Sequence, residues 1–261
     1  MDILQQKSWK ILLIGDSCED VYHYGVCERM SPEAPVPVFK EISKEVRGGM
    51  SMNVRHNLEN FGLSVDHFHN QEVIRKNRFV ESRYMQQLFR CDEGENERVK
   101  SFICPAKEDI LKYDAIVISD YNKGFVTEKA FSQLRENTPL EIPIFVDSKK
   151  NDLSIFDNCI IKINNIEEAK ATFGKNQEII VTLGKQGAKW RSNIYPAEKV
   201  DVYDVCGAGD VFLASLVYGW LKYEKSLESG ILLANKCSSL SVTKSGTYVI
   251  TKEDILKILE N

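Results

Sequence analysis

Short apolar runs separated by amphipathic stretches form the main pattern of this chain. Five runs rich in β-branched residues occur, at 11–14, 115–118, 144–146, 159–163 and 178–182. Uninterrupted apolar runs of this length are typical of strands buried on both faces, as in a parallel sheet. Residues 53–61 and 166–173 instead carry apolar side chains at helical spacing, and each stretch is followed by a glycine suited to a helix C-cap. This alternation predicts a doubly wound, mostly parallel α/β sheet flanked by helices.

Two parts of the chain alternate apolar with polar residues, one over 36–42 and the other over 79–91 and 98–103. Such alternation predicts antiparallel strands with one exposed face, and the polar stretch 91–98 predicts a hairpin loop between them. We therefore expect one domain, 1–261, that carries a small β-sheet lid built from residues near 20–45 and 79–104. Pairing across a dimer protects the edges of such a lid, so we expect a homodimer through it.

Composition and charge narrow the classes of function. The chain has 261 residues, 43% of them hydrophobic, and a formal net charge of -4 at pH 7. This balance gives no electrostatic reason to bind nucleic acid or an anionic membrane, and no stretch approaches the ~20 apolar residues of a membrane span. The seven cysteines are scattered without a C-x-x-C pair, which disfavours a zinc site. We expect a cytoplasmic protein that acts on a small molecule.

A DVCGAGD stretch directly precedes residues 211–223, whose apolar positions form the wide stripe of a buried helix. Unpaired N–H groups at a helix start attract anions, and the small residues Gly207, Ala208 and Gly209 would let an anion approach. Asp210 would stand within one turn of that anion and could accept a proton from an attacking hydroxyl. The alternative is an ordinary tight turn in which Asp210 caps the helix.

The same stretch resembles the C-terminal signature of the ribokinase-like (PfkB) carbohydrate kinases. Companion motifs occur in the order of that family: GGMSMN from Gly48, N-x-x-E from Asn164, T-x-G-x-x-G from Thr182, and a C-terminal segment with Asn235 and Ser245 to Thr247. The resemblance implies a ribokinase-like fold and transfer of the γ-phosphoryl group of ATP to a sugar hydroxyl, with Mg2+ as the metal.

The N-terminal half is similar to the kinase module of bacterial heptose 7-phosphate kinases. The stretches that carry this likeness are GDSCEDVYHYG, SPEAPVPV, RYMQQLFR, SDYNKG and VDSK. It implies phosphorylation of D-glycero-D-manno-heptose 7-phosphate to the 1,7-bisphosphate, on the route to the activated heptose of lipopolysaccharide. Another carbohydrate or nucleoside kinase of the family, and a non-catalytic homologue that binds a nucleotide or a sugar, are the alternatives. Met50, Met52 and Cys206 depart from the small or threonine-like residues usual at their positions.

The resemblance implies roles for individual residues. Asp210 would be the catalytic base, and the N–H groups of Gly207, Ala208 and Gly209 would stabilise the transferring phosphoryl group. The implied sugar-binding residues are Asp20, Gly48, Gly49 and Asn53, with Arg83, Arg90 and Lys123 as candidates for the phosphate of the substrate. The implied nucleotide-binding residues are Asn164, Lys149, Thr182, Gly184, Gly187 and Asn235, and Glu167 with Asn164 would hold Mg2+. Two plainer readings stay open, namely a helix capping box at Asn164 and Glu167, and lid arginines that serve solubility.

Overall fold

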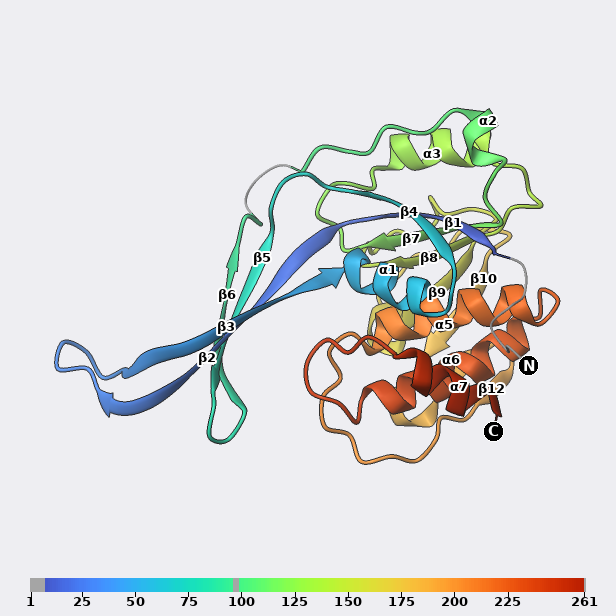
Figure 1. Ribbon diagram of the computed structural model, residues 1–261. Helices are drawn as coiled ribbons and strands as arrows, with labels where there is room; N and C mark the ends of the chain where they lie inside the picture. The colour runs from blue at the N-terminus through green and yellow to red at the C-terminus, as the bar shows by residue number, and fades with distance from the viewer. Residues whose placement is uncertain (1–7, 96–98, 261) are drawn as a thin grey trace.

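The computed structural model describes residues 8–95 and 99–260, and its main sheet has eight strands in the order β12-β11-β10-β9-β8-β7-β1-β4 (Figure 1). The parallel strands are β1 (Lys10–Gly15), β4 (Ser64–His69), β7 (Ala115–Asp120), β8 (Ile144–Ser148), β9 (Ile160–Asn164) and β10 (Glu178–Thr182). The antiparallel strands are β11 (Ala188–Trp190) and β12 (Asn193–Tyr195). All five strands expected from the apolar runs are confirmed, as β1, β7, β8, β9 and β10.

Helices cover both faces of this sheet. The first face packs against α1 (Ser51–Asn60), α5 (Ala208–Lys222), α6 (Leu227–Ser241) and α7 (Lys252–Glu260), and the second against α2 (Lys107–Ile110) and α3 (Glu128–Asn137). Successive residues of a strand point to opposite faces of the sheet. Ile11 of β1 therefore packs in the hydrophobic core of the first face, and Leu12 packs in that of the second. The predicted doubly wound α/β architecture is confirmed.

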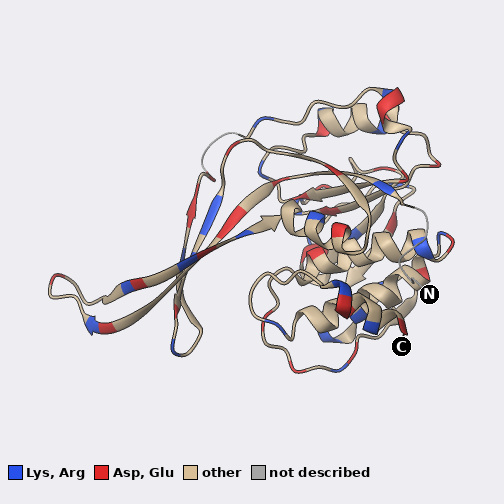
Figure 2. Cartoon of the chain, in the orientation of Figure 1, with Lys and Arg blue, Asp and Glu red and all other residues tan. Residues whose placement is uncertain are grey.

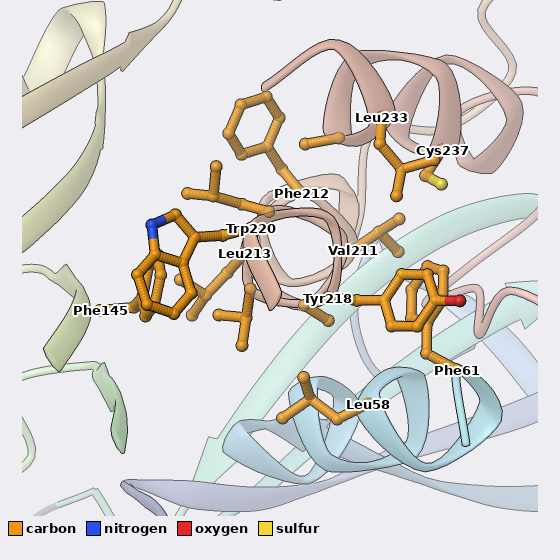
Figure 3. Packing of buried hydrophobic residues seen from close by; sticks show 14 of the residues in the cluster. Leu58, Phe61, Phe145, Val211, Phe212, Leu213, Tyr218, Trp220, Leu233 and Cys237 are labelled. Atoms are coloured by element: carbon orange, nitrogen blue, oxygen red, sulfur yellow. The ribbon is translucent and has the colours of Figure 1, made fainter. Parts of the chain in front are cut away.

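Helix α5 is buried on nearly every side, which explains why its sequence is almost wholly apolar. In Figure 3 its side chains meet Leu58 of α1, Phe61 directly after that helix, Leu233 of α6 and Phe145 of β8. A helix held on all sides has little freedom to shift, and this rigidity passes to the residues at its N-terminus.

A second sheet of four strands, in the order β3-β2-β5-β6, forms the lid. Its strands are β2 (Ser17–Met30), β3 (Pro37–Met50), β5 (Arg75–Glu81) and β6 (Gln86–Glu93). Figure 1 shows β2 and β3 as a long two-stranded ribbon that projects from the main domain. The chain passes directly from the main sheet into this ribbon, because β2 begins only two residues after β1 ends. The lid is confirmed as a small separate sheet.

Three local predictions for the lid are wrong. The segment 79–91 is not one strand, because β5 and β6 are joined by a turn at 82–85. The expected hairpin loop at 91–98 therefore follows the hairpin, and residues 96–98 lie outside the described residues. Residues 99–103 form no strand, and Phe102 instead donates its N–H to the carbonyl of Phe125 at 3.1 Å.

The helix predicted over 166–173 is also wrong, since α4 (Asn165–Glu168) makes a single turn. Thr172 leaves the helical path because its backbone exchanges hydrogen bonds of 2.8 Å with Asn151 and Leu153. The C-terminal helix α7 follows Thr251, whose hydroxyl accepts the N–H of Asp254 at 3.1 Å.

Charge is mixed over the molecule, with Lys, Arg, Asp and Glu alternating along the lid and across the helices (Figure 2). Within residues 8–95 and 99–260 no helix is both long enough and apolar enough to cross a bilayer.

Candidate active site

The Gly-Ala-Gly turn forms the start of α5, with Gly207 as its N-cap in a left-handed conformation at φ 76°. A side chain at Gly207 would place its Cβ 2.8 Å from Nδ2 of Asn53, and one at Gly209 would place its Cβ 2.8 Å from Nζ of Lys162. Gly207 therefore needs glycine for its backbone angle, and a side chain at Gly209 would press on the ammonium group of Lys162. The N–H of Ala208 donates to the carbonyl of Val205 at 3.3 Å, which leaves the neighbouring glycine amides as the better anion donors.

Asp210 lies in the first turn of α5 and is only 4% exposed. Its Oδ2 accepts a hydrogen bond of 3.0 Å from Nδ2 of Asn53, and its Oδ1 accepts one of 2.8 Å from the hydroxyl of Tyr121. Burial raises the pKa of Asp210 to about 6, although both hydrogen bonds oppose the shift. A carboxylate with a pKa near neutrality is well suited to general-base catalysis. The carboxylate thus faces α1 and β7 and does not act as a simple helix cap.

Lys162 is a functional candidate that sequence reasoning missed. It is the charged residue within the apolar run that becomes β9, and this break in the run was the available signal. Its buried Nζ lies 2.6 Å from Oδ2 of Asp147 and borders Gly209. Burial alone would raise the pKa of Asp147, but Lys162 and Lys149 hold it below its usual value. The Asp147 carboxylate therefore stays charged beside the N–H groups at 207–209, which we call the anion cradle.

The predicted sugar-side residues also converge on the start of α5. Asp20 of β2 is buried, and its Oδ2 accepts a hydrogen bond of 3.3 Å from Thr247. A side chain at Gly49 would collide with the Asp20 carboxylate, and one at Gly48 would collide with Met52. The methyl group of Thr247 in turn lies 3.1 Å from where a Cβ of Gly207 would stand. The lid, α1 and the cradle are therefore in contact around one point.

Each of the three cations expected to bind a substrate phosphate already has a carboxylate partner. The pairs are Arg83 with Glu81 at 2.6 Å, Arg90 with Asp92 at 2.7 Å, and Lys123 with Glu95 at 2.7 Å. These residues lie on or beside the lid, and the structure does not bring them into contact with Asp210. Their binding role stays a prediction.

Two cations of β5, Lys76 and Arg78, lie closer to the site, and sequence reasoning missed both. Arg78 pairs with Asp20 across 3.1 Å, and Nζ of Lys76 lies 5.6 Å from the ring centroid of Tyr121. Their i, i+2 spacing on an alternating strand was the available signal, since such residues share one face. Arg90 stands directly opposite Arg78 in the β5–β6 ladder and so belongs to the same face.

A cavity of 560 Å³ opens beside the cradle, between β10, the loop 197–205 and the helices α5 and α6. Its lining includes the predicted nucleotide residues Thr182, Gly184, Gly187 and Asn235 together with Ala208 and Gly209. Small-molecule sites commonly measure about 300 to 1,000 Å³, so the cavity is large enough for a nucleotide whose phosphates would reach the start of α5. Asn235 supports the cavity wall, because its Nδ2 donates to the carbonyl of Tyr195 at 2.8 Å.

Asn164 and Glu167 form the capping box that was the plainer reading of their motif. Asn164 Oδ1 accepts the N–H groups of Ile166 and Glu167 at 3.0 and 2.9 Å. The same Glu167 also faces the site, since its Oε1 lies 2.7 Å from Nζ of Lys149. That ammonium group is 3.6 Å from Oδ1 of Asp147, a buried oxygen with no hydrogen-bond partner among the described residues. Glu167 and Asp147 thus offer two hard oxygen donors around one cation, and such oxygens are the ligands that Mg2+ prefers.

Comparison with known proteins agrees with this geometry. A family model described as pfkB family carbohydrate kinase matches residues 50–254. The bifunctional protein HldE of Campylobacter jejuni (strain RM1221) is 30% identical, over 98% of this chain and 66% of that protein, so this chain spans just under two thirds of its relative.

Solved structures share the fold at low identity. Phosphofructokinase-2 from Escherichia coli in complex with potassium matches with a TM-score of 0.70 and 17% identity, over 97% of this chain and 99% of that chain. Ribokinase from Cryptococcus neoformans var. grubii serotype A in complex with ADP matches with a TM-score of 0.67 and 14% identity, over the same shares. The chain therefore belongs to the pfkB family of carbohydrate kinases and is a sugar kinase with a ribokinase-like fold.

Proposed function

We propose that this enzyme transfers the γ-phosphoryl group of ATP to the anomeric hydroxyl of D-glycero-D-manno-heptose 7-phosphate and forms the 1,7-bisphosphate. The observation that carries the proposal is the buried Asp210 at the mouth of a glycine cradle, with a nucleotide-sized cavity on one side and the lid on the other. The motifs similar to heptose 7-phosphate kinases supply the choice of sugar. Because ATP is a cytoplasmic metabolite, we place the reaction in the cytoplasm.

In this proposal Asp210 takes the proton of the sugar hydroxyl as that oxygen forms its bond to the γ-phosphorus. The bond between the γ-phosphorus and its bridging oxygen breaks, and ADP leaves with the electron pair. The amides of Gly207 and Gly209 and the ammonium group of Lys162 would offset the charge on the transferring group. Asn53 keeps the carboxylate aimed at the sugar side.

We place Mg2+ at Glu167, with Asn164 keeping this helix start in shape. The ion supplies charge neutralisation for the ATP phosphates. Lys149, which pairs with Glu167 in the structure, is free to contact a phosphate once a divalent cation takes that carboxylate. Lys149 and Glu167 thus serve the nucleotide side together.

For the phosphate already on the substrate we propose Lys76 and Arg78, with Arg90 as the third member of that lid face. Lys76 is the best candidate, because it is half-buried, faces the site and has no carboxylate within 4.0 Å among the described residues. Arg83 and Lys123 remain candidates to bind this phosphate when the lid closes over the substrate. Loss of Lys76 is expected to raise the KM for a sugar phosphate far more than that for an unphosphorylated sugar.

The direct test is an assay of ADP release with heptose 7-phosphate, fructose phosphates, ribose and adenosine as acceptors. We expect turnover with heptose 7-phosphate, and a loss of ~10²–10⁴-fold in Asp210→Asn, because the base is removed with little change of shape. Asp66→Asn is the matched control, since Asp66 lies on the edge strand β4, well away from the cradle. Turnover of another acceptor alone would replace the heptose assignment with that sugar. Equal turnover by Asp210→Asn with every acceptor would favour the non-catalytic homologue that binds a nucleotide or sugar.

We also propose a homodimer through the outer lid face. The rings of His23, Phe79 and Phe89 stack there with centroids 4.5 and 4.3 Å apart, and Phe39 meets Phe79 edge-on at 5.4 Å. Phe89 is 52% exposed. These positions alternate with Asp20 and Arg78, so they point away from the site. Sedimentation velocity is expected to give a dimer for the wild type and a monomer for Phe89→Asp. A wild-type protein that is monomeric at about 50 μM would contradict the proposal.

A further inference from the structure

Tyr121 occupies a place that no motif role accounts for. It follows β7 directly at the carboxyl edge of the sheet, and its N–H donates to Oδ2 of Asp16 at 2.8 Å. Asp16 also accepts the N–H groups of Lys123 and Phe125 at 3.3 Å, so one buried carboxylate organises the whole loop 121–125. The backbone of Tyr121 is therefore held firmly, and its side chain leads to Asp210.

The hydroxyl of Tyr121 donates to Oδ1 of Asp210 at 2.8 Å, while Asn53 donates to Oδ2. With one donor on each oxygen the carboxylate cannot rotate freely, and each oxygen keeps a lone pair for a substrate. We infer that Tyr121 is a positioning residue for the reaction, one that orients the Asp210 carboxylate and keeps it ionised so that it can take the proton of the sugar hydroxyl. This inference rests on the role proposed for Asp210.

The phenol can act as a donor throughout the working range. Burial, together with the charges of Asp210 and Asp147, raises the pKa of Tyr121 well above its ordinary value. Two ammonium groups lie over its ring, those of Lys76 from the lid and Lys149 from the nucleotide side, at 5.6 and 5.9 Å from the centroid. Tyr121 thus touches the lid, the base and the nucleotide side at once.

The charged groups around Asp210 come from several elements, whereas Tyr121 is a neutral hydrogen-bond donor. Asp147 of β8 raises the pKa of Asp210, and Lys162 of β9 lowers it. Lys149, after β8, and Cys18 of β2 also interact with Asp210, and burial raises the pKa of Cys18 to about 12, so its thiol stays neutral. Among the residues that the structure describes, Asn53 and Tyr121 are the two neutral donors to the carboxylate. Asn53 is also a proposed sugar ligand, which makes Tyr121 the cleaner residue to change.

The chain contains a closely matched control in Tyr113, at the opposite end of the same strand. Tyr113 is buried, and its hydroxyl donates to Oδ2 of Asp66 at 2.7 Å. Lys10 and Lys112 lie over its ring, both at 5.4 Å from the centroid. Tyr113→Phe therefore removes the same kind of hydrogen bond from a more exposed carboxylate, since the Asp66 side chain is 39% exposed, and it does so away from the cradle.

The test that needs no substrate is a ¹³C NMR titration of the Asp side-chain carboxyl groups in the full chain, with Asp210→Asn to assign the Asp210 signal. We expect Tyr121→Phe to move the Asp210 titration upward by about one pH unit, because a hydrogen bond to the charged form is lost. Tyr113→Phe is expected to move Asp66 upward and leave Asp210 in place. An unmoved Asp210 titration in Tyr121→Phe would overturn the inference, whichever sugar is the substrate.

Kinetics gives the second readout, with the best acceptor from the ADP-release assay. The acid limb of kcat is expected to move upward with the NMR titration, so that Tyr121→Phe loses about 5-fold more rate at pH 6 than at pH 8.5. A uniform loss at every pH would mean that Tyr121 only packs, and the inference would fall while the role of Asp210 stands. An Asp210→Asn enzyme as active as the wild type would instead remove the role of Asp210 itself.

If Tyr121→Phe does not fold, 3-fluorotyrosine in the otherwise unchanged protein replaces it. The fluorine makes the phenol a stronger hydrogen-bond donor, so the pKa of Asp210 should fall by roughly 0.3 pH units. No movement, or movement upward, would overturn the inference.

Discussion

Met50 is the N-cap of α1, with φ 55° and ψ -130°, a backbone conformation that L side chains rarely adopt. Such residues carry about 1 to 3 kcal/mol of strain. The side chain is nevertheless buried, 3% exposed, within the core cluster that also contains Cys18 and Ile14. The strain is therefore stored directly before the helix that carries Asn53.

Comparing Met50→Gly with Met50→Ala isolates the strain, because both variants lose the same buried side chain, at about 2 to 5 kcal/mol. Glycine relieves the strain but makes the unfolded chain more flexible, which costs about 0.4 to 1 kcal/mol relative to alanine. The difference leaves Met50→Gly more stable than Met50→Ala by about 1 kcal/mol.

Urea unfolding at fixed pH measures the two free energies of unfolding, and a gap of this size corresponds to a Tm difference of about 2 to 4 °C. Met52, two residues later within α1, is the matched control. There the order should reverse, with Met52→Ala more stable than Met52→Gly by about 1 kcal/mol, since alanine is the better helix former. If Met50→Ala equals or exceeds Met50→Gly, Met50 is not strained and the reasoning fails.

Three further predictions concern charge and space around the site. Burial and the nearby His69 lower the pKa of His67 from 6.5 to about 3. The folded protein therefore keeps His67 neutral, and the free energy of unfolding is highest above pH 6.5 and decreases as the pH falls below 6.5. Urea unfolding should show a loss of about 2 kcal/mol by pH 5 that is absent in His67→Asn. Lys162→Met should lower the free energy of unfolding by about 3 to 5 kcal/mol, and adding Asp147→Asn should restore part of it, because the first change alone leaves a buried carboxylate unpaired; strictly additive losses would contradict this. Gly209→Ala should keep the fold by circular dichroism but lose ~10²-fold in turnover, because its Cβ enters the cradle, and full activity would show that the cradle is not used.

Local pattern was sufficient for most of the fold. The apolar runs predicted β1, β7, β8, β9 and β10, because a strand buried on both faces requires apolar residues on both. The glycines of the DVCGAGD stretch likewise predicted the start of α5, since a turn with a left-handed residue and no room for side chains accepts few other residues. These features depend on neighbours within a few positions along the chain.

Local pattern failed where a distant segment supplied the deciding contact. Residues 166–173 have a helical pattern, yet α4 stops after one turn because the backbone of Thr172 bonds to residues 151 and 153. The turn at 82–85 was missed for a different reason, since the alternation continues through it and does not mark where β5 ends and β6 begins. At Thr172, by contrast, tertiary pairing overrode local propensity.

The sequence alone therefore determined which residue types stand at the start of α5, but not what surrounds them. Asn53 lies 157 positions and Tyr121 lies 89 positions from Asp210, and Lys162 reaches the cradle only because β9 ends beside it. A carboxylate acquires a pKa near 6 through burial and through donors brought from other strands and helices, and these depend on the path of the whole chain. The chemistry of Asp210 is in this sense a property of the tertiary structure, because in an unfolded chain water would surround it and its pKa would return to about 3.9.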